Sequence, residues 1–404
     1  MRLFGIQQSL IILLTIYLST FAFRSYGQVL PSSTDISYLY NPNATIYLRH
    51  KLVSSDEKRW IILELITPKS VADSLLFGLA LTPNLDKPLD TFTKLDMASF
   101  RIFESGKNQL FAIDISNIKS NFAVFRIVQK STPDSYTYII ELGNPAGLII
   151  STTTLTLPDL KGYAIKGSTV KLSTLYGANA DFGVSFFGKN TEPSLPPMAD
   201  MKLLDPFEKP DTTFTAISGD SLATTKTGLY TIFNEKDEKR TTFFRIEDES
   251  YPKIATVDKL IEASIYFLTR DERKKLQNSS DPKKLYDSFW LNNTNSAERA
   301  GKMISAYFNR VKEANEKFTT YKEGWKTDMG MIYIIFGPPD KVFRTNDGVQ
   351  WVYKKTYELP SITFTFYSNN KFITSEYYEL ERSTQFQTVW FRAIELWRKG
   401  RKSL

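Results

Sequence analysis

The sequence predicts an α+β protein of several domains, with an N-terminal antiparallel β-sandwich region, a helical connector and a C-terminal α+β module that holds a small antiparallel sheet. Three observations support this prediction. Short segments rich in Ile, Val, Phe, Tyr and Thr recur from about residue 45 to 188. The apolar period becomes helical after Tyr251-Pro252, and the chain ends in alternating segments and one more helix. A chain of 404 residues is long enough for two to four domains.

The first 27 residues have the pattern of a secretory signal peptide. Arg2 gives a positive start, residues 3–23 carry no charge, and Ser25 and Gly27 are small residues placed before a cut ahead of Gln28. The alternative is an uncleaved anchor, because an uncharged stretch of this length could just span a bilayer. The chain has no cysteine, so we expect neither a lipoprotein nor disulfides. We predict an exported protein that is periplasmic or associated with the outer membrane.

The charge of the chain suggests a class of partner but no specific one. The formal net charge is +7, and cleavage after residue 27 would remove Arg2 and Arg24 and leave +5. Such a mild excess suits an anionic surface such as lipid headgroups or envelope polysaccharide. Nucleic acid is not expected as a partner of an exported protein.

Residues 28–188 are predicted to form one β-sandwich domain of immunoglobulin-like layout. Its expected strands are 45–53, 59–66, 99–103, 109–115, 122–128, 136–142, 148–157, 169–176 and 181–187. Clusters of Gly, Pro, Asn, Asp and Ser separate them, and this regular spacing is typical of antiparallel sandwiches.

Two shorter regions follow the sandwich. Residues 189–210 contain five prolines and no apolar period, which predicts a linker or long loop. Residues 211–249 contain three strand-like segments, and the last two are expected to pair as a hairpin. The sequence leaves open whether this region is a second small β-domain or completes the first.

Helices are predicted from residue 254 to 318. Thr269 and Glu272 have the spacing of a capping box, Asp281-Pro282 is an N-cap followed by proline at the first helical position, and Ser296 caps a long helix. The module that these helices open is predicted to span residues 250–404.

The most constrained stretch of the chain is residues 324–340. Gly324-Trp325-Lys326-Thr327-Asp328 is followed by the apolar run 331–336, which is predicted as a strand, and by the turn 337–340, Gly-Pro-Pro-Asp. The sheet is expected to extend over 331–380, with a hairpin turn at 368–371 and a final helix over 384–399.

These residues resemble the GWxTD domain family of exported bacterial proteins. The resemblance covers roughly residues 250–380 and includes Tyr266-Phe267-Leu268-Thr269, Phe289-Trp290 and the helix that ends near Phe318. Met329 stands where many relatives have arginine, so no cation is expected there. The family has no established activity, and the resemblance therefore implies an envelope context rather than a mechanism.

The C-terminal module is also similar, at the level of fold, to the small lipoprotein of the outer-membrane β-barrel assembly machinery. The similarity lies in Gly337-Pro338-Pro339, Trp351-Val352-Tyr353 and the alternating strand with Phe364 and Phe366. A likeness of fold does not by itself imply function.

Few residues suit catalysis. His50 is the only histidine, and with no cysteine this leaves little for a Ser-His-Asp triad, a Cys-His pair or a zinc site. Asp328 and Asp340, with Glu323, could act as an acid–base pair or hold calcium, but carboxylates in turns more often bond the backbone. No phosphate-binding or calcium-loop motif occurs, so no cofactor and no metal site is predicted.

We therefore expect a non-enzymatic envelope protein that binds another envelope, secretion or assembly component through the C-terminal module. The predicted binding surface consists of Gly324, Trp325, Thr327, Asp328, Gly337, Pro338, Pro339 and Asp340. The alternative is a protein that binds envelope glycan, either polysaccharide or peptidoglycan, through its tryptophans and basic residues. A more distant alternative is an acid–base hydrolase that uses the motif carboxylates.

Overall fold

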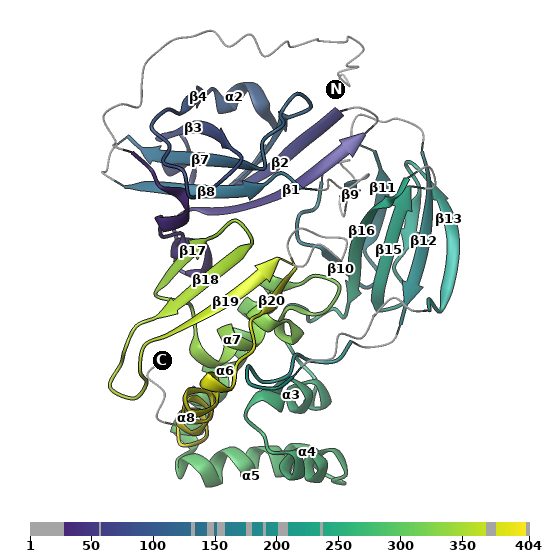
Figure 1. Ribbon diagram of the computed structural model, residues 1–404. Coiled ribbons are helices and arrows are strands. Elements are labelled where there is room, and N and C mark those ends of the chain that lie inside the picture. Colours follow the sequence, from purple (N-terminus) through teal and green to yellow (C-terminus); the bar gives the residue numbers. More distant parts are fainter. Residues whose placement is uncertain are drawn as a thin grey trace.

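The computed structural model places two β-sandwiches beside a third body that consists of helices and one small sheet (Figure 1). The mixed α+β class predicted from the sequence is confirmed. The structure describes residues 28–55, 58–130, 134–143, 149–151, 158–174, 180–188, 191–200, 209–234, 237–368 and 377–400. The predicted signal peptide and most of the predicted turn at 368–371 lie outside these residues.

The first sandwich consists of two four-stranded antiparallel sheets, in the orders β1-β2-β6-β5 and β4-β3-β7-β8. Its elements are β1 (Tyr47–Ser55), β2 (Lys58–Ile66), α1 (Lys69–Ala72), β3 (Leu75–Thr82), β4 (Thr93–Leu95), α2 (Met97–Phe100), β5 (Arg101–Ser105), β6 (Asn108–Asp114), β7 (Phe122–Gln129) and β8 (Ser135–Glu141). Side chains alternate between the faces of a strand, so both sheets contribute every second residue to one core, as Leu63 and Phe125 do.

The second sandwich packs a five-stranded sheet, β10-β16-β15-β12-β13, against a three-stranded one, β14-β11-β9. Its strands are β9 (Ile149–Ser151), β10 (Tyr163–Ile165), β11 (Thr169–Ser173), β12 (Asp181–Phe187), β13 (Thr212–Ile217), β14 (Ser221–Ala223), β15 (Gly228–Asn234) and β16 (Asp237–Glu247). Leu172 of the smaller sheet and Phe182 of the larger one lie in the same core.

This pairing corrects the predicted division of the chain. The strands β9 to β12 precede residue 188, yet they form sheets with strands that follow residue 211, so the two sandwiches divide between β8 and β9. An alternating pattern identifies a strand but not its neighbour, and only the pairing reveals the boundary. The predicted hairpin is present as β15 and β16. Residues 191–200, inside the predicted linker, hold no helix or strand, and Ser194 donates its backbone N–H to the Lys326 carbonyl at 2.9 Å.

The predicted helices and their caps are confirmed. The helices are α3 (Val257–Ala263), α4 (Arg270–Gln277), α5 (Pro282–Thr294) and α6 (Ala297–Phe318). Thr269 and Glu272 form the reciprocal capping box. The side chains of Asp281 and Ser296 accept backbone N–H groups at the starts of α5 and α6.

The apolar run 331–336, predicted as a strand, is instead part of the helix α7 (Asp328–Phe336). Every residue of this helix up to Ile335 is buried, so the run has no polar face from which a helical period could be read. The sheet begins after it, in the order β17-β18-β19-β20, and α8 follows. These elements are β17 (Lys341–Arg344), β18 (Gly348–Tyr353), β19 (Ile362–Ser368), β20 (Tyr378–Leu380) and α8 (Gln387–Arg398).

The N-terminal segment before β1 lies between the first sandwich and the C-terminal sheet (Figure 1). Ile36 donates its N–H to the Val342 carbonyl at 2.9 Å and packs into the core of the third body. Arg344 of β17 reaches Glu141 of β8 at 2.6 Å. The N-terminal segment and β8 of the first sandwich therefore both contact β17.

Within the described part of the chain, no helix combines the length and the apolar character needed to cross a membrane.

Candidate functional site

The segment Gly324–Asp328 lies in the interior of the third body. Trp325 is 2% exposed, and Lys326 and Asp328 are 0% exposed. Gly324–Lys326 forms a 3₁₀ turn between α6 and α7. These residues therefore do not form the surface loop predicted from the sequence, because their side chains have no access to a partner in this conformation.

Two glycines let the turn contact its neighbours backbone to backbone. A Cβ atom added to Gly324 would lie 2.0 Å from the Ala314 carbonyl oxygen of α6. A Cβ atom added to Gly330 would lie 1.9 Å from the Gly324 carbonyl oxygen. No side chain fits at such distances, so glycine is required by close approach at both positions.

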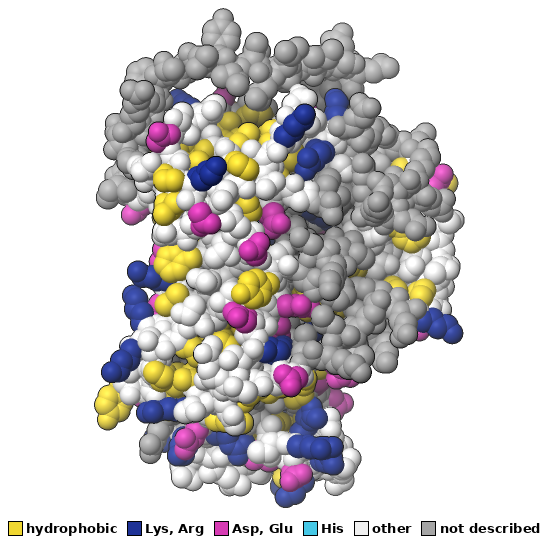
Figure 2. Space-filling view, in the orientation of Figure 1, with side chains coloured by type: hydrophobic (Ala, Val, Ile, Leu, Met, Phe, Trp, Pro, Cys, Tyr) yellow, Lys and Arg dark blue, Asp and Glu magenta, His cyan; other side chains and the backbone are white. Residues whose placement is uncertain are grey.

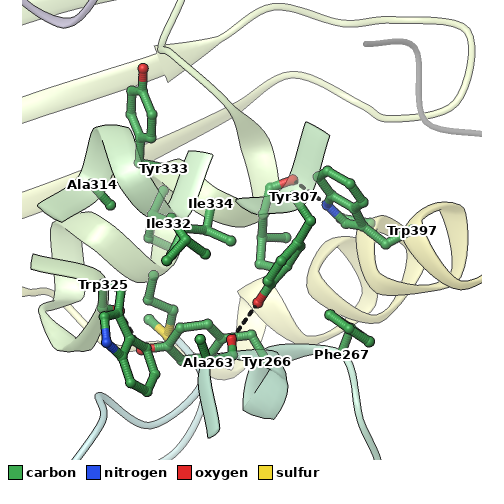
Figure 3. Packing of buried hydrophobic residues seen from close by; sticks show 14 of the residues in the cluster. Ala263, Tyr266, Phe267, Tyr307, Ala314, Trp325, Ile332, Tyr333, Ile334 and Trp397 are labelled. Carbon is green, nitrogen blue, oxygen red and sulfur yellow. Dashed lines mark hydrogen bonds between the residues drawn. The ribbon is translucent and has the colours of Figure 1, made fainter. Parts of the chain in front are cut away.

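Trp325 is part of the hydrophobic core (Figure 3). Its backbone N–H donates to Asn315 Oδ1 at 3.0 Å, and the Tyr266 hydroxyl donates to its carbonyl oxygen at 2.8 Å. The Tyr266 and Trp325 rings meet edge to face, with centroids 6.2 Å apart. The tryptophan thus ties the 3₁₀ turn to α6 and to the segment after α3.

Thr327 and Asp328 begin α7. Thr327 Oγ1 accepts the Gly330 N–H at 2.9 Å and donates to the Gly324 carbonyl at 2.7 Å, which makes it the N-cap. Asp328 Oδ2 accepts the Leu380 N–H at 2.9 Å, and Oδ1 lies 2.5 Å from Arg382 Nη2. Thr327 therefore caps the helix, and Asp328 connects the helix to β20.

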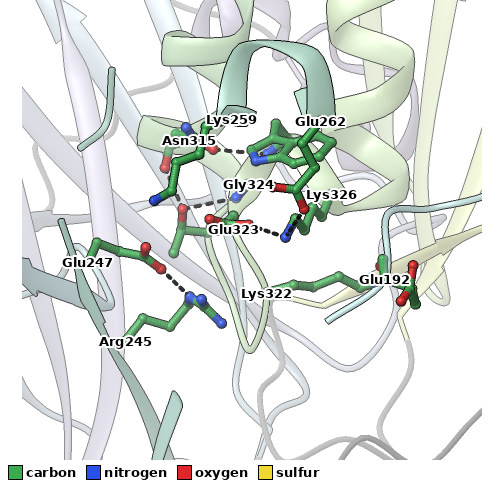
Figure 4. Close-up of polar contacts among 12 residues, drawn as sticks. Glu192, Arg245, Glu247, Lys259, Glu262, Asn315, Lys322, Glu323, Gly324 and Lys326 are labelled. Carbon is green, nitrogen blue, oxygen red and sulfur yellow. Dashed lines mark hydrogen bonds and ion pairs between the residues drawn. The ribbon is translucent and has the colours of Figure 1, made fainter. Parts of the chain in front are cut away.

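Lys326 is the centre of a buried charged network (Figure 4). Its ammonium lies 2.6 Å from Glu323 Oε2 and 3.0 Å from Glu262 Oε1. Beside this cluster, β16 of the second sandwich carries a buried pair in which Arg245 Nε lies 2.5 Å from Glu247 Oε1. Burial raises the pKa of the Glu247 carboxyl, and the negative charge of Glu323 adds to this effect, while Arg245 opposes it. Buried charges need partners of opposite charge, so we interpret this network as part of the packing of the fold rather than as a reactive site.

The turn 337–340 is partly accessible. Gly337 has a φ of +90°, which glycine tolerates best, and its carbonyl accepts the Tyr353 hydroxyl at 2.8 Å. Pro339 is buried, whereas Pro338 and Asp340 are exposed. Asp340 Oδ2 accepts the Lys354 N–H at 2.8 Å, so this carboxylate bonds the neighbouring strand rather than its own turn.

The tryptophans are all core residues. Each is at most 5% exposed, so no sugar ring can stack on them in this conformation: Trp60, Trp290, Trp325, Trp351, Trp390 and Trp397. For the same reason the tryptophan platform considered for a glycan is not available.

His50 lies between the sheets of the first sandwich, where its Nδ1 is 2.8 Å from the Tyr138 hydroxyl oxygen. Burial, together with the charge of Arg344, lowers the pKa of His50 from 6.5 to about 4, so the ring is neutral at pH 7. In the described residues, no group of three or more His, Asp or Glu side chains is placed to hold a metal ion.

The sequence reasoning did not single out the hairpin that joins β18 to β19. Tyr357 at its end is 98% exposed. The turn is held by the Thr356 N–H bond to the Leu359 carbonyl at 2.8 Å and by the Leu359 N–H bond to Thr356 Oγ1 at 3.0 Å. Figure 1 shows this hairpin projecting at the lower left, away from both sandwiches. Tyr357 lies in the polar segment 354–360, whose sequence does not indicate whether the ring packs on the sheet or projects into solvent.

Comparison with known proteins gives one match. Residues 228–399 match the family model of the GWxTD domain, which begins at β15 and ends just after α8. No curated protein and no solved structure matches the chain, so the suggested likeness to the small assembly lipoprotein gains no support.

Proposed function

This chain contains a GWxTD domain over residues 228–399, and from that premise we propose that it is a non-enzymatic envelope protein that binds another envelope component through this domain. The signal-peptide pattern of residues 1–27 supports the location. The internal partners of Lys326, Thr327 and Asp328 support a structural rather than chemical role for the motif.

The contact surface must then lie outside the motif. The observation that carries the proposal is Tyr357, a large aromatic side chain held in the solvent by a hydrogen-bonded turn. Tyrosine buries much area on binding and has few torsions to fix, and a preset backbone reduces the entropy lost. These are properties of an interface anchor.

The surroundings of Tyr357 favour a partner with negative charge. Lys354 and Lys355 precede it and are exposed, and Lys341 is exposed on β17 of the same sheet. Figure 2 shows lysine and arginine side chains spaced along the left edge of this face, beside the sheet. Complementary charge would steer an acidic protein surface toward the hairpin.

The test is a crosslinked pull-down from cell envelopes with the tagged mature chain, beside Tyr357→Ala and the matched control Tyr367→Ala. Tyr367 lies on β19 and is 46% exposed, so the control removes a tyrosine from the same sheet. We expect one envelope protein to be enriched by the wild type and the control and lost with Tyr357→Ala. Equal capture by both variants would place the contact elsewhere. Retention of the chain in the polysaccharide fraction with no protein enriched would favour the glycan alternative.

A further inference from the structure

A pocket of about 200 Å³ lies where the first sandwich, the C-terminal end of α6 and the sheet of the GWxTD domain meet. Its walls include Tyr47, Arg49 and His50 of β1, Glu316 to Thr320 around the end of α6, and Arg344 and Val349 of the sheet. No single body of the fold encloses the pocket, and it exists only where these parts are packed together.

The charges that line this pocket are mostly positive. Among the described residues, four cations line it, Arg49, Lys161, Lys317 and Arg344, and Glu316 is the one lining carboxylate. Arg344 is neutralised by Glu141 at 2.6 Å. Arg49 has its nearest ion-pair contact with Glu64 at 3.9 Å, the limit for such a pair.

Lys317 is half-buried, and none of its contacts with the described residues is an ion pair. Its ammonium donates to the Leu39 carbonyl at 3.3 Å and lies 5.0 Å from the centre of the Tyr47 ring. The described part of the chain offers it no carboxylate within 4 Å. An ammonium has three donors, and the Leu39 carbonyl uses one.

Burial lowers the pKa of two bases in the pocket. Burial lowers the pKa of Lys317 to about 8, and Arg49 lowers it further while Glu313 and Glu316 oppose. Burial also lowers the pKa of His50, with the charge of Arg344 as a second cause. An ammonium that burial has deprived of water is stabilised where an anion takes the place of that water.

We propose that this pocket binds a small oxyanion, a carboxylate or a phosphate group, with Lys317 as its main contact and Arg49 as the second charge. The anion would accept from the free donors of the Lys317 ammonium and supply the missing negative charge. This site is separate from the Tyr357 hairpin, so the anion proposal and the proposed function can be tested independently of each other.

The first test measures the melting temperature of the mature chain at pH 7 with sulfate or acetate, against chloride at equal ionic strength. Sulfate stands for a phosphate group, and acetate for a carboxylate. We expect a saturable rise with one or both anions, because a ligand that binds only the folded state stabilises it. Lys317→Met should abolish the rise. The control Lys302→Met, an exposed lysine on the same helix, should keep it. A rise with sulfate alone assigns a phosphate ligand, and a rise with acetate alone assigns a carboxylate.

The second test uses pH, because neither probe changes its charge between pH 7 and 9. The groups around Lys317 are Arg49 and Tyr47 of β1 and Glu313 and Glu316 of α6. The binding constant should fall by about tenfold over this range as the ammonium loses its proton. Lys317→Arg, which stays charged, should show no such fall. The proposal is overturned if neither anion gives a saturable shift in the wild type, or if Lys317→Met responds as the wild type does.

Discussion

Asp328 and Arg382 form an ion pair inside the GWxTD domain, with Asp328 Oδ1 2.5 Å from Arg382 Nη2 and the carboxylate fully buried. Asp328 Oδ2 holds the Leu380 N–H, and Arg382 also donates to the carbonyls of Leu195 and Pro196. The last residue of the motif thereby connects α7, β20 and the segment between β12 and β13 of the second sandwich.

Arg382→Met should lower the free energy of unfolding by about 3–5 kcal/mol, because it leaves a buried carboxylate without its partner. Urea denaturation followed by tryptophan fluorescence measures this. Lys302→Met, which breaks an exposed pair with Glu298, serves as the control and should cost less than about 1 kcal/mol. Equal effects of the two substitutions would contradict a role for the buried pair.

Gly330→Ala and Gly301→Ala should have opposite effects. A Cβ at Gly330 would meet the Gly324 carbonyl at 1.9 Å, so the turn or α7 must shift and the domain is destabilised. Gly301 lies within α6 with nothing within 4 Å of its Cβ position, so alanine there should stabilise by about 0.5–1 kcal/mol. Melting temperatures of the two variants give the comparison. If Gly330→Ala left the melting temperature unchanged, the contact between residue 330 and the Gly324 carbonyl would not be tight.

Trp325→Ala should lower the free energy of unfolding of the domain. The side chain is 2% exposed, and its removal leaves a cavity beside Tyr266, at a cost of about 3–5 kcal/mol. Denaturant unfolding measures the free energy of unfolding of this variant and of Tyr357→Ala, and so distinguishes a core side chain from an exposed one. The second substitution should change stability by less than about 0.5 kcal/mol, since Tyr357 is 98% exposed. A fully stable Trp325→Ala would be inconsistent with the packing described.

His50 should make the first sandwich less stable in acid. Its pKa is about 4 in the folded chain, against an ordinary value of 6.5 for a histidine in the unfolded chain, so the unfolded chain binds the proton more readily. Stability should therefore decrease as the pH falls from 6.5 to 4, by about 3 kcal/mol from this group. Unfolding free energies at pH 4 and pH 7 for the wild type and His50→Gln measure the contribution. The variant should have the smaller difference, and equal differences would exclude His50 as the cause.

The sequence alone determined the elements whose signals are local. The capping box of Thr269 and Glu272 and the N-caps Asp281 and Ser296 are side-chain bonds to the next turn of backbone, so residue type and spacing specify them. The alternating strands and the GWxTD motif could also be read in order along the chain, because each depends on neighbours a few residues away.

Tertiary structure decided the rest. The apolar run 331–336 is a helix that the sequence pattern does not reveal. Both its faces are buried, so no polar side marks the helical period. The boundary between the sandwiches followed from which strands pair. The motif lies inside the domain because Gly324 permits backbone contact with α6 and Gly330 permits contact with the Gly324 carbonyl. Burial, strand pairing and the position of Lys317 and Arg49 in the wall of one pocket depend on residues distant in sequence. A local pattern carries no information about them.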